Sequence, residues 1–262
     1  MKRIILLLCS IAIILTSCTS AVTDISAFEY TIKEDTVLIK SYVGQEKQVV
    51  IPSEIEGYPV TAIGFSAFGR QDIETVVIPD TVTVIEEYAF GDCLYLSEIH
   101  FGSGLITIED NAFYGCVSLK NLELPKGLQS IGECAFSACI GLKQVFIPNS
   151  IEHWRQSAFM SDTALTTILF EEGTKTIGGW ATFHACYSLE TITFPDSVEL
   201  IEDGTFMRCA FIKDVIFNGN APIMNEAFYM EGRDMKEINI HYKEGTSGWD
   251  AEVWQKYTLV KS

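Results

Sequence analysis

Positive charge is scarce in this chain of 262 residues. Lysine and arginine together number 18 against 35 aspartates and glutamates, so the formal net charge at pH 7 is −17. This surplus of carboxylates repels the phosphate backbone of DNA and RNA. The composition therefore argues against nucleic acid as a partner, whereas a hydrophobic content of 48% is ample for a continuous core.

Residue patterns that carry catalysis are also lacking. The chain has four histidines, and their spacing matches neither a zinc-binding pair nor a catalytic triad. No glycine-rich loop of the kind that cradles phosphate occurs in the sequence. We therefore expect no enzyme activity, no cofactor and no metal. Turnover that depends on His184 or Cys134 would be the evidence for the enzymatic alternative.

Long apolar runs are confined to the N-terminus, where Lys2 and Arg3 precede an apolar segment over residues 4–15. As a helix with a rise of about 1.5 Å per residue, this segment would span roughly 18 Å, well short of the roughly 30 Å hydrocarbon layer of a membrane. It is therefore predicted to be a cleaved signal peptide over residues 1–17 and not a membrane-spanning helix.

The sequence Leu15-Thr16-Ser17-Cys18 resembles a bacterial lipobox. The resemblance implies cleavage before Cys18, attachment of a diacylglyceryl group to its thiol, and a tether over residues 18–27. The protein would then be exported, anchored to the bacterial cell envelope and surface-exposed, and would touch the membrane through this lipid only. An ordinary secretory signal with an incidental Cys18 is the alternative.

One repeat dominates the rest of the chain. A capping hairpin is expected over residues 28–48, repeats over 49–240 and a C-terminal cap over 241–262. A phenylalanine, usually preceded by alanine, returns every 22 to 24 residues, a period typical of a solenoid whose units depend on their neighbours for burial. These residues are Phe68, Phe90, Phe113, Phe136, Phe159, Phe183, Phe206 and Phe228.

Each unit repeats the same order of apolar positions. An aliphatic residue stands five before the phenylalanine, a cysteine often three after it and a leucine six after it. We expect a short helical turn at the phenylalanine, followed by a strand whose outer two residues point inward and whose middle residue points outward. The predicted strands include Val145-Phe146-Ile147, Ile168-Leu169-Phe170, Val215-Ile216-Phe217 and Ile238-Asn239-Ile240.

This unit, approximately Leu-x-x-Ile-x-Ile-Pro, Val-x-x-Ile-Gly, x-x-Ala-Phe and x-x-Cys, resembles the BspA-like leucine-rich repeat over roughly residues 49–240. The resemblance implies a right-handed leucine-rich-repeat superhelix, mostly β, with one parallel β-sheet. It also implies a bacterial surface protein, because some members are similar to adhesins that bind extracellular host proteins or other cells. The family specifies the fold more closely than the function.

The repeated cysteines are predicted to pack in the core. Small apolar thiols suit a crowded inner turn, whereas one thiol per coil provides neither the converging ligands of a metal site nor good disulfide geometry. Disulfide or metal use is the alternative. Cys134 lies off this ladder and is expected to be more exposed and reactive. The ladder consists of Cys93, Cys116, Cys139, Cys186 and Cys209.

The outward face of the predicted sheet is the candidate partner site. Phe146 and Leu169 should be neighbours on an open face with a polar rim, as in many protein-binding surfaces. Alternatively, the two side chains are isolated apolar residues of the kind that strands tolerate, or a terminal cap covers them. The candidate residues are Gln144, Phe146, Thr167, Leu169, Thr193 and Ile216.

The repeat is least regular beside this site. Trp154 replaces the usual isoleucine, and the next unit carries an extra residue, assigned to Thr182, together with Trp180. These tryptophans, with acidic pairs such as Glu109-Asp110, form the basis of a second hypothesis, a glycan- or cation-binding envelope protein. A solvated acidic edge would account for the pairs more simply. We expect a lipid-anchored, non-catalytic binding or adhesion module for an extracellular protein ligand, such as host matrix or another cell surface.

Overall fold

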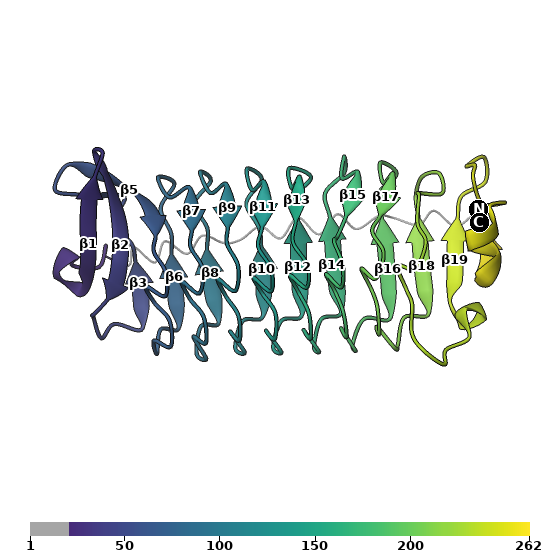
Figure 1. Ribbon diagram of the computed structural model, residues 1–262, viewed down its shortest axis with the longest axis horizontal. Helices are drawn as coiled ribbons and strands as arrows, with labels where there is room; N and C mark the ends of the chain where they lie inside the picture. The colour runs from purple at the N-terminus through teal and green to yellow at the C-terminus, as the bar shows by residue number, and fades with distance from the viewer. Residues whose placement is uncertain (1–20) are drawn as a thin grey trace.

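The computed structural model describes residues 21–262 as an elongated stack of coils, with β1 and β2 at one end and the C-terminal segment at the other (Figure 1). Strands and turns make up nearly all of it. In these residues the helical elements are three short 3-10 segments, η1 (Ile25–Ala27), η2 (Met235–Glu237) and η3 (Glu252–Lys256). The predicted repeat solenoid is confirmed. The predicted signal peptide and lipidated Cys18 lie outside the described residues, within which no helix is long and apolar enough to cross a membrane.

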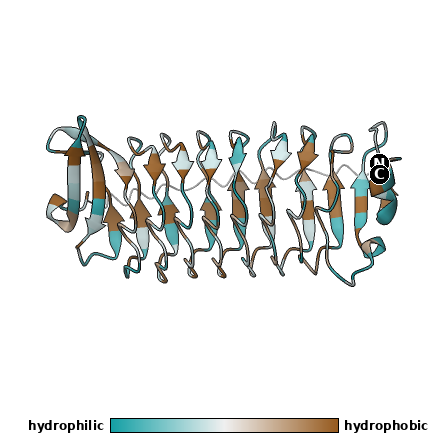
Figure 2. Ribbon diagram, in the orientation of Figure 1, coloured by the Kyte–Doolittle hydropathy of each residue, from teal (hydrophilic) through white to brown (hydrophobic). Residues whose placement is uncertain are grey.

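One row of parallel strands, here called the first ladder, runs along the stack (Figure 1). Its strands pair in register within three sheets. In most of them the second residue is buried and the first and third face outward, an alternation that the hydropathy in Figure 2 illustrates. The strands are β3 (Gln48–Val50), β6 (Thr75–Val77), β8 (Glu98–His100), β10 (Asn121–Glu123), β12 (Gln144–Ile147), β14 (Thr167–Phe170), β16 (Thr191–Phe194), β18 (Asp214–Phe217), β19 (Asn239–Tyr242) and β20 (Thr258–Lys261).

A second ladder of strands is present where the sequence predicts one sheet. In most units the aliphatic residue five before the phenylalanine forms a strand with the residue before it, because peptide groups on this side of the coil also need partners in the next coil. These strands are parallel. They are β5 (Tyr58–Ile63), β7 (Val84–Ile85), β9 (Thr107–Ile108), β11 (Ser130–Ile131), β13 (His153–Trp154), β15 (Thr176–Ile177) and β17 (Leu200–Ile201).

The turn at each phenylalanine differs from the predicted helical turn. The residues two before and two after Phe90, Tyr88 and Asp92, both have left-handed backbone angles, with φ of 54° and 56°. This alternation points the N–H groups of the turn along the stack, and Phe90 N–H donates to the Ala112 carbonyl at 2.7 Å. A helical turn would keep those bonds within one coil. The turns therefore add a third row of hydrogen bonds between coils.

The phenylalanines form a continuous stack through the core. Neighbouring ring centroids from Phe68 to Phe228 lie 4.8–5.3 Å apart, with interplanar angles of 16° or less. Each of these rings is at most 2% exposed. A fully buried aromatic ring contributes a large apolar area, and its stacked contacts require both neighbouring coils. The stack explains why single units depend on the array.

The cysteine ladder lies beside the phenylalanine stack. All five thiols are free and buried, and each Sγ donates to the carbonyl of a repeat phenylalanine in an earlier coil at 3.0–3.5 Å. Burial raises the pKa of the Cys116, Cys139 and Cys186 thiols well above its ordinary value. The packing position predicted for the ladder is confirmed.

The N-terminal end of the solenoid is closed by a hairpin. Strands β1 (Phe28–Lys33) and β2 (Thr36–Tyr42) pair antiparallel, and β2 continues parallel to β5, which also pairs with β4 (Glu54–Ile55). The predicted tether over residues 18–27 is too long. Thr23 and Ala27 are buried, and Thr23 N–H donates to the Val50 carbonyl at 3.0 Å, so residues 23–27 pack on the first coil.

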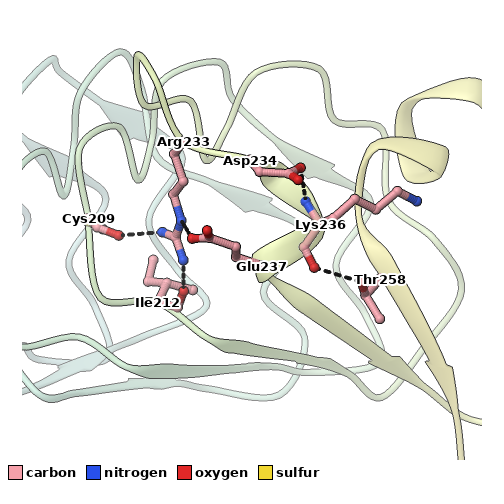
Figure 3. Close-up of polar contacts among 7 residues, drawn as sticks. All are labelled: Cys209, Ile212, Arg233, Asp234, Lys236, Glu237 and Thr258. Atoms are coloured by element: carbon pink, nitrogen blue, oxygen red, sulfur yellow. Dashed lines mark hydrogen bonds and ion pairs between the residues drawn. The ribbon is translucent and has the colours of Figure 1, made fainter.

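The C-terminal end is closed by a polar anchor and an aromatic cluster. The mostly buried Arg233 donates through Nη1 to the Cys209 carbonyl at 3.3 Å and through Nη2 to the Ile212 carbonyl, and its Nε lies 3.7 Å from Glu237 (Figure 3). These contacts join the segment before η2 to carbonyls of the preceding coil. Beyond the anchor, Trp249 and Trp254 cover the last core rings.

Candidate binding surface

The outward side of β12 and β14 brings the predicted apolar pair together. Phe146 is directly opposite Leu169 in the parallel register, and Gln144 is opposite Thr167. Leu169 is 44% exposed and Phe146 is half-buried. Strands β12 and β14 lie midway along the stack, away from both terminal caps (Figure 1). Neither cap covers this apolar pair.

Thr193 and Ile216 lie in the same outward column but in a different sheet. They are opposite each other on β16 and β18, and no strand pairing joins β14 to β16 within residues 21–262. The six predicted residues therefore form two groups along one row of strands. Glu123, opposite Phe146 on the other side, completes the polar rim of the first group.

The column continues onto residues that the sequence did not place there. Ile216 is opposite His241 and Asp214 is opposite Asn239, so the predicted strand Ile238-Asn239-Ile240 is shifted by two residues. The true pattern is Asn239-Ile240-His241-Tyr242, which matches the alternation of Asp214-Val215-Ile216-Phe217. Comparing four strand residues per unit instead of three would have identified the correct register, because Tyr242 then corresponds to Phe217.

Hydrogen bonds fix the polar end of this surface. Asp214 accepts from His241 Nε2 at 2.7 Å and from Asn239 Nδ2 at 3.1 Å. The hydrogen bond from His241, followed by that from Asn239, holds the pKa of Asp214 below its ordinary value. This end is therefore polar and carries an ionised carboxylate, in contrast to the apolar pair at β12 and β14.

Carboxylates of the acidic pairs accept hydrogen bonds from backbone N–H groups of neighbouring coils. Asp110 Oδ1 accepts the Glu133 N–H at 2.7 Å, and Glu86 Oε2 accepts the Phe65 N–H at 2.8 Å. Each donor directly precedes a left-handed turn residue, Cys134 or Ser66, so the carboxylate satisfies an N–H group at the start of the turn. Among the described residues, no group of three or more histidine, cysteine, aspartate or glutamate side chains could hold a metal ion.

Cys134 does not have the environment of a reactive thiol. It sits at a left-handed turn position with φ of 53° and is partly buried. Burial is the main cause that raises the pKa of the thiol, and the negative charge of Glu133 raises it further. A raised pKa reduces the thiolate fraction at neutral pH and hence the reactivity.

Both ladders are interrupted at one junction, here called the seam, between the coil of β13 and β14 and the coil of β15 and β16. At each of the five paired junctions of the second ladder, at least two N–H groups of one coil donate to carbonyls of the preceding coil at 2.8–3.2 Å. The corresponding bonds from Thr176 to Glu152 and from Gly178 to Trp154 are absent from the described chain.

The extra residue of this coil lies at the seam. The bond from Phe159 N–H to the Thr182 carbonyl, 2.8 Å long, is equivalent to that from Phe136 to Ala158. Thr182 therefore occupies the regular alanine position and is not the insertion. Gly178 and Gly179 stand where other coils have one residue, and the buried Thr182 hydroxyl bonds both the N–H and the carbonyl of Gly179.

Comparison with known proteins places the repeats of this chain in a known family. A family described as the BspA type leucine-rich repeat region matches residues 61–181 and 161–248, with six copies. A leucine-rich repeat protein of T. pallidum, TpLRR, is 29% identical, covers 73% of this chain and 91% of its own, and has a TM-score of 0.66. One from Bacteroides ovatus is 20% identical, with coverages of 92% and 76% and a TM-score of 0.59. No curated protein matches the chain.

Proposed function

Because this chain belongs to the BspA-type leucine-rich repeat family, we propose that it is a lipid-anchored, non-catalytic module that binds an extracellular protein at the bacterial cell surface. The main evidence is the apolar pair Phe146 and Leu169, which lie opposite each other on an uncovered strand face. Adjacent apolar side chains with a polar rim are the usual centre of a protein interface.

The N-terminal sequence supports export and anchoring. The apolar run over residues 4–15 and the lipobox-like sequence ending at Cys18 have the order of a lipoprotein signal. A thioether-linked lipid at Cys18 would leave the solenoid outside the bilayer. A single acyl chain binds membranes weakly, so the two chains of a diacylglyceryl group suit stable anchoring.

The test is binding of the chain to an array of extracellular-matrix proteins, with the double variant Phe146→Glu, Leu169→Glu. Two buried carboxylates at the centre of an apolar contact should weaken binding at least about a hundredfold. The control is Val77→Glu, His100→Glu, which adds two carboxylates at the same outward column of β6 and β8. Equal binding by both variants would contradict the proposal.

A glycan-binding envelope protein is the second candidate. Trp180 supports it, because the side chain is 56% exposed and lies against Gly204, leaving an open aromatic face. Binding that survives the Phe146→Glu, Leu169→Glu change would favour this candidate and would direct attention to the seam.

A further inference from the structure

A cleft opens where the second ladder is interrupted. It has a volume of about 490 Å³, within the range of small-molecule sites. Glu152 and Trp154 line it from one coil, Thr176 and Gly178 from the next, and Glu202 from the one after. The cleft thus lies across the seam, on a different ladder from Phe146 and Leu169.

The cleft contains hydrogen-bonding groups that the fold leaves without partners. The N–H groups of Thr176 and Gly178 and the carbonyls of Glu152 and Trp154 do not form the ladder bonds made at the other paired junctions of the described chain. The indole Nε1 of Trp154 is buried and has no partner among residues 21–262. Such groups cost free energy unless something bonds to them. Donors and acceptors are interspersed, so the matching ligand offers both.

The width of the seam limits what can enter. The Phe159 and Phe183 rings still stack at 5.2 Å, and the turn bond from Ser161 to His184 is 2.8 Å. The coils therefore keep their normal separation at the core. A peptide strand inserted between β13 and β15 would need about twice the normal 4.8 Å spacing. The ligand must instead lie along the open side of the cleft.

The negative charge around the cleft limits the class of ligand that can bind there. A second cleft of about 300 Å³ shares Ser130 and Arg155 with the first, so the two adjoin. It adds the carboxylates of Glu87, Glu109 and Asp110. Together the clefts present five carboxylates against one guanidinium, that of Arg155, which lies 3.9 Å from Asp110. This field attracts cationic ligands and repels acidic ones.

We propose that the seam cleft binds an amino-sugar oligosaccharide. Its hydroxyl groups both donate and accept, which matches the unpaired N–H and carbonyl groups, and its ammonium groups suit the carboxylate rim. This site is independent of the protein-binding face, so either assignment can fail alone.

The experiment is calorimetric titration of the purified protein with glucosamine trisaccharide, maltotriose and galacturonic acid trisaccharide. We expect the glucosamine trisaccharide to bind at least about tenfold more tightly than maltotriose, with galacturonic acid trisaccharide weakest. Trp154→Phe, and separately Glu152→Gln with Glu202→Gln, should each weaken binding about tenfold, whereas Glu98→Gln on the other ladder should not. Absence of binding, tightest binding of the acidic sugar, or binding unaffected by the cleft variants overturns the proposal.

A variant that closes the cleft separates lost binding from lost folding. Deleting Gly179 and changing Thr182→Ala gives this coil the length and the alanine of the regular units. The ladder bonds to Glu152 and Trp154 should then form, thermal stability should rise, and glucosamine trisaccharide binding should disappear. A closed, more stable variant that still binds would overturn the assignment to the seam, as would a variant in which Phe146→Glu, Leu169→Glu removed saccharide binding.

Discussion

A buried acid interrupts the cysteine ladder. Asp162 lies three residues after Phe159, at the position that Cys139 and Cys186 occupy in neighbouring coils, and it is fully buried. Its Oδ1 accepts the Cys139 N–H at 2.8 Å, but its Oδ2 has no partner among the described residues. Burial raises the pKa of this carboxyl well above its ordinary value, against the smaller effect of the Cys139 N–H.

Asp162 should make the protein less stable at neutral pH than in acid. The folded state favours the protonated carboxyl, so between the unfolded pKa of about 3.9 and the raised folded pKa the native state binds more protons. Stability at this site is therefore fully present below about pH 4 and is lost as the pH rises. Asp162→Cys should raise the free energy of unfolding at pH 7 by about 1–3 kcal/mol, the cost of an unpaired buried polar group.

Urea denaturation of the two proteins across pH 4–8 measures this difference. Asp162→Asn is the matched control, because it retains an oxygen for the Cys139 N–H and cannot ionise. The gain in free energy of unfolding of each variant over the natural protein should grow as the pH rises from 4 to 8, because only the natural protein has the buried carboxyl that must ionise. A difference from the natural protein that does not change with pH in either variant would mean that Asp162 is not the titrating group.

At the scale of one coil, two alanine substitutions test which side chains face the core and which face outward. Phe136→Ala should lower the free energy of unfolding by about 3–5 kcal/mol, because the ring is fully buried between Phe113 and Phe159 and leaves a cavity. Phe146→Ala should cost less than about 1 kcal/mol, since that ring is half-buried on the outward face. Thermal denaturation of both variants provides the comparison. Equal losses would mean that the strand faces are reversed.

Much of the coil follows from the sequence because burial imposes a strict pattern. The spacing of Phe68 through Phe228 predicts the stack, and the alternation in Val145-Phe146-Ile147 predicts the inward and outward sides. The left-handed turn residues do not follow from it, because Tyr88 and Cys134 are residue types that avoid positive φ. Hydrogen bonds to the next coil offset that conformational cost, and such long-range bonds have no local sequence signal.

The candidate site was predictable only where the repeat is regular. The pairing of Phe146 with Leu169 follows from two adjacent units of standard length. The seam does not follow from the sequence. An extra residue shows that a coil is irregular, but it does not show which hydrogen bonds that coil loses. Thr182 looks like the insertion when units are aligned on Phe183, whereas the hydrogen bonds place it at Gly178 and Gly179.

At the scale of the whole molecule, four sets of contacts join each coil to the next: the two strand ladders, the hydrogen bonds of the turns and the phenylalanine stack. A solenoid is stabilised by nearest-neighbour interfaces, so the weakest interface decides where the array opens first. At the seam both ladders are interrupted while the turn bonds and the Phe159–Phe183 stack remain. The seam is therefore the expected site of local opening.

Amide hydrogen exchange tests this with two glycines at equivalent positions. Gly132 and Gly178 both follow the buried isoleucine of the second ladder and are both buried, but only the Gly132 N–H is bonded, to the Ile108 carbonyl at 2.8 Å. Because a hydrogen bond contributes about 1 kcal/mol and the seam opens more easily, the Gly178 amide should exchange at least about tenfold faster. Deleting Gly179 with Thr182→Ala should bring the two rates together and raise the free energy of unfolding by about 1–3 kcal/mol, the contribution of two restored bonds. Equal rates in the natural protein would mean that the ladder is closed in solution and that the seam is no weaker than the other junctions.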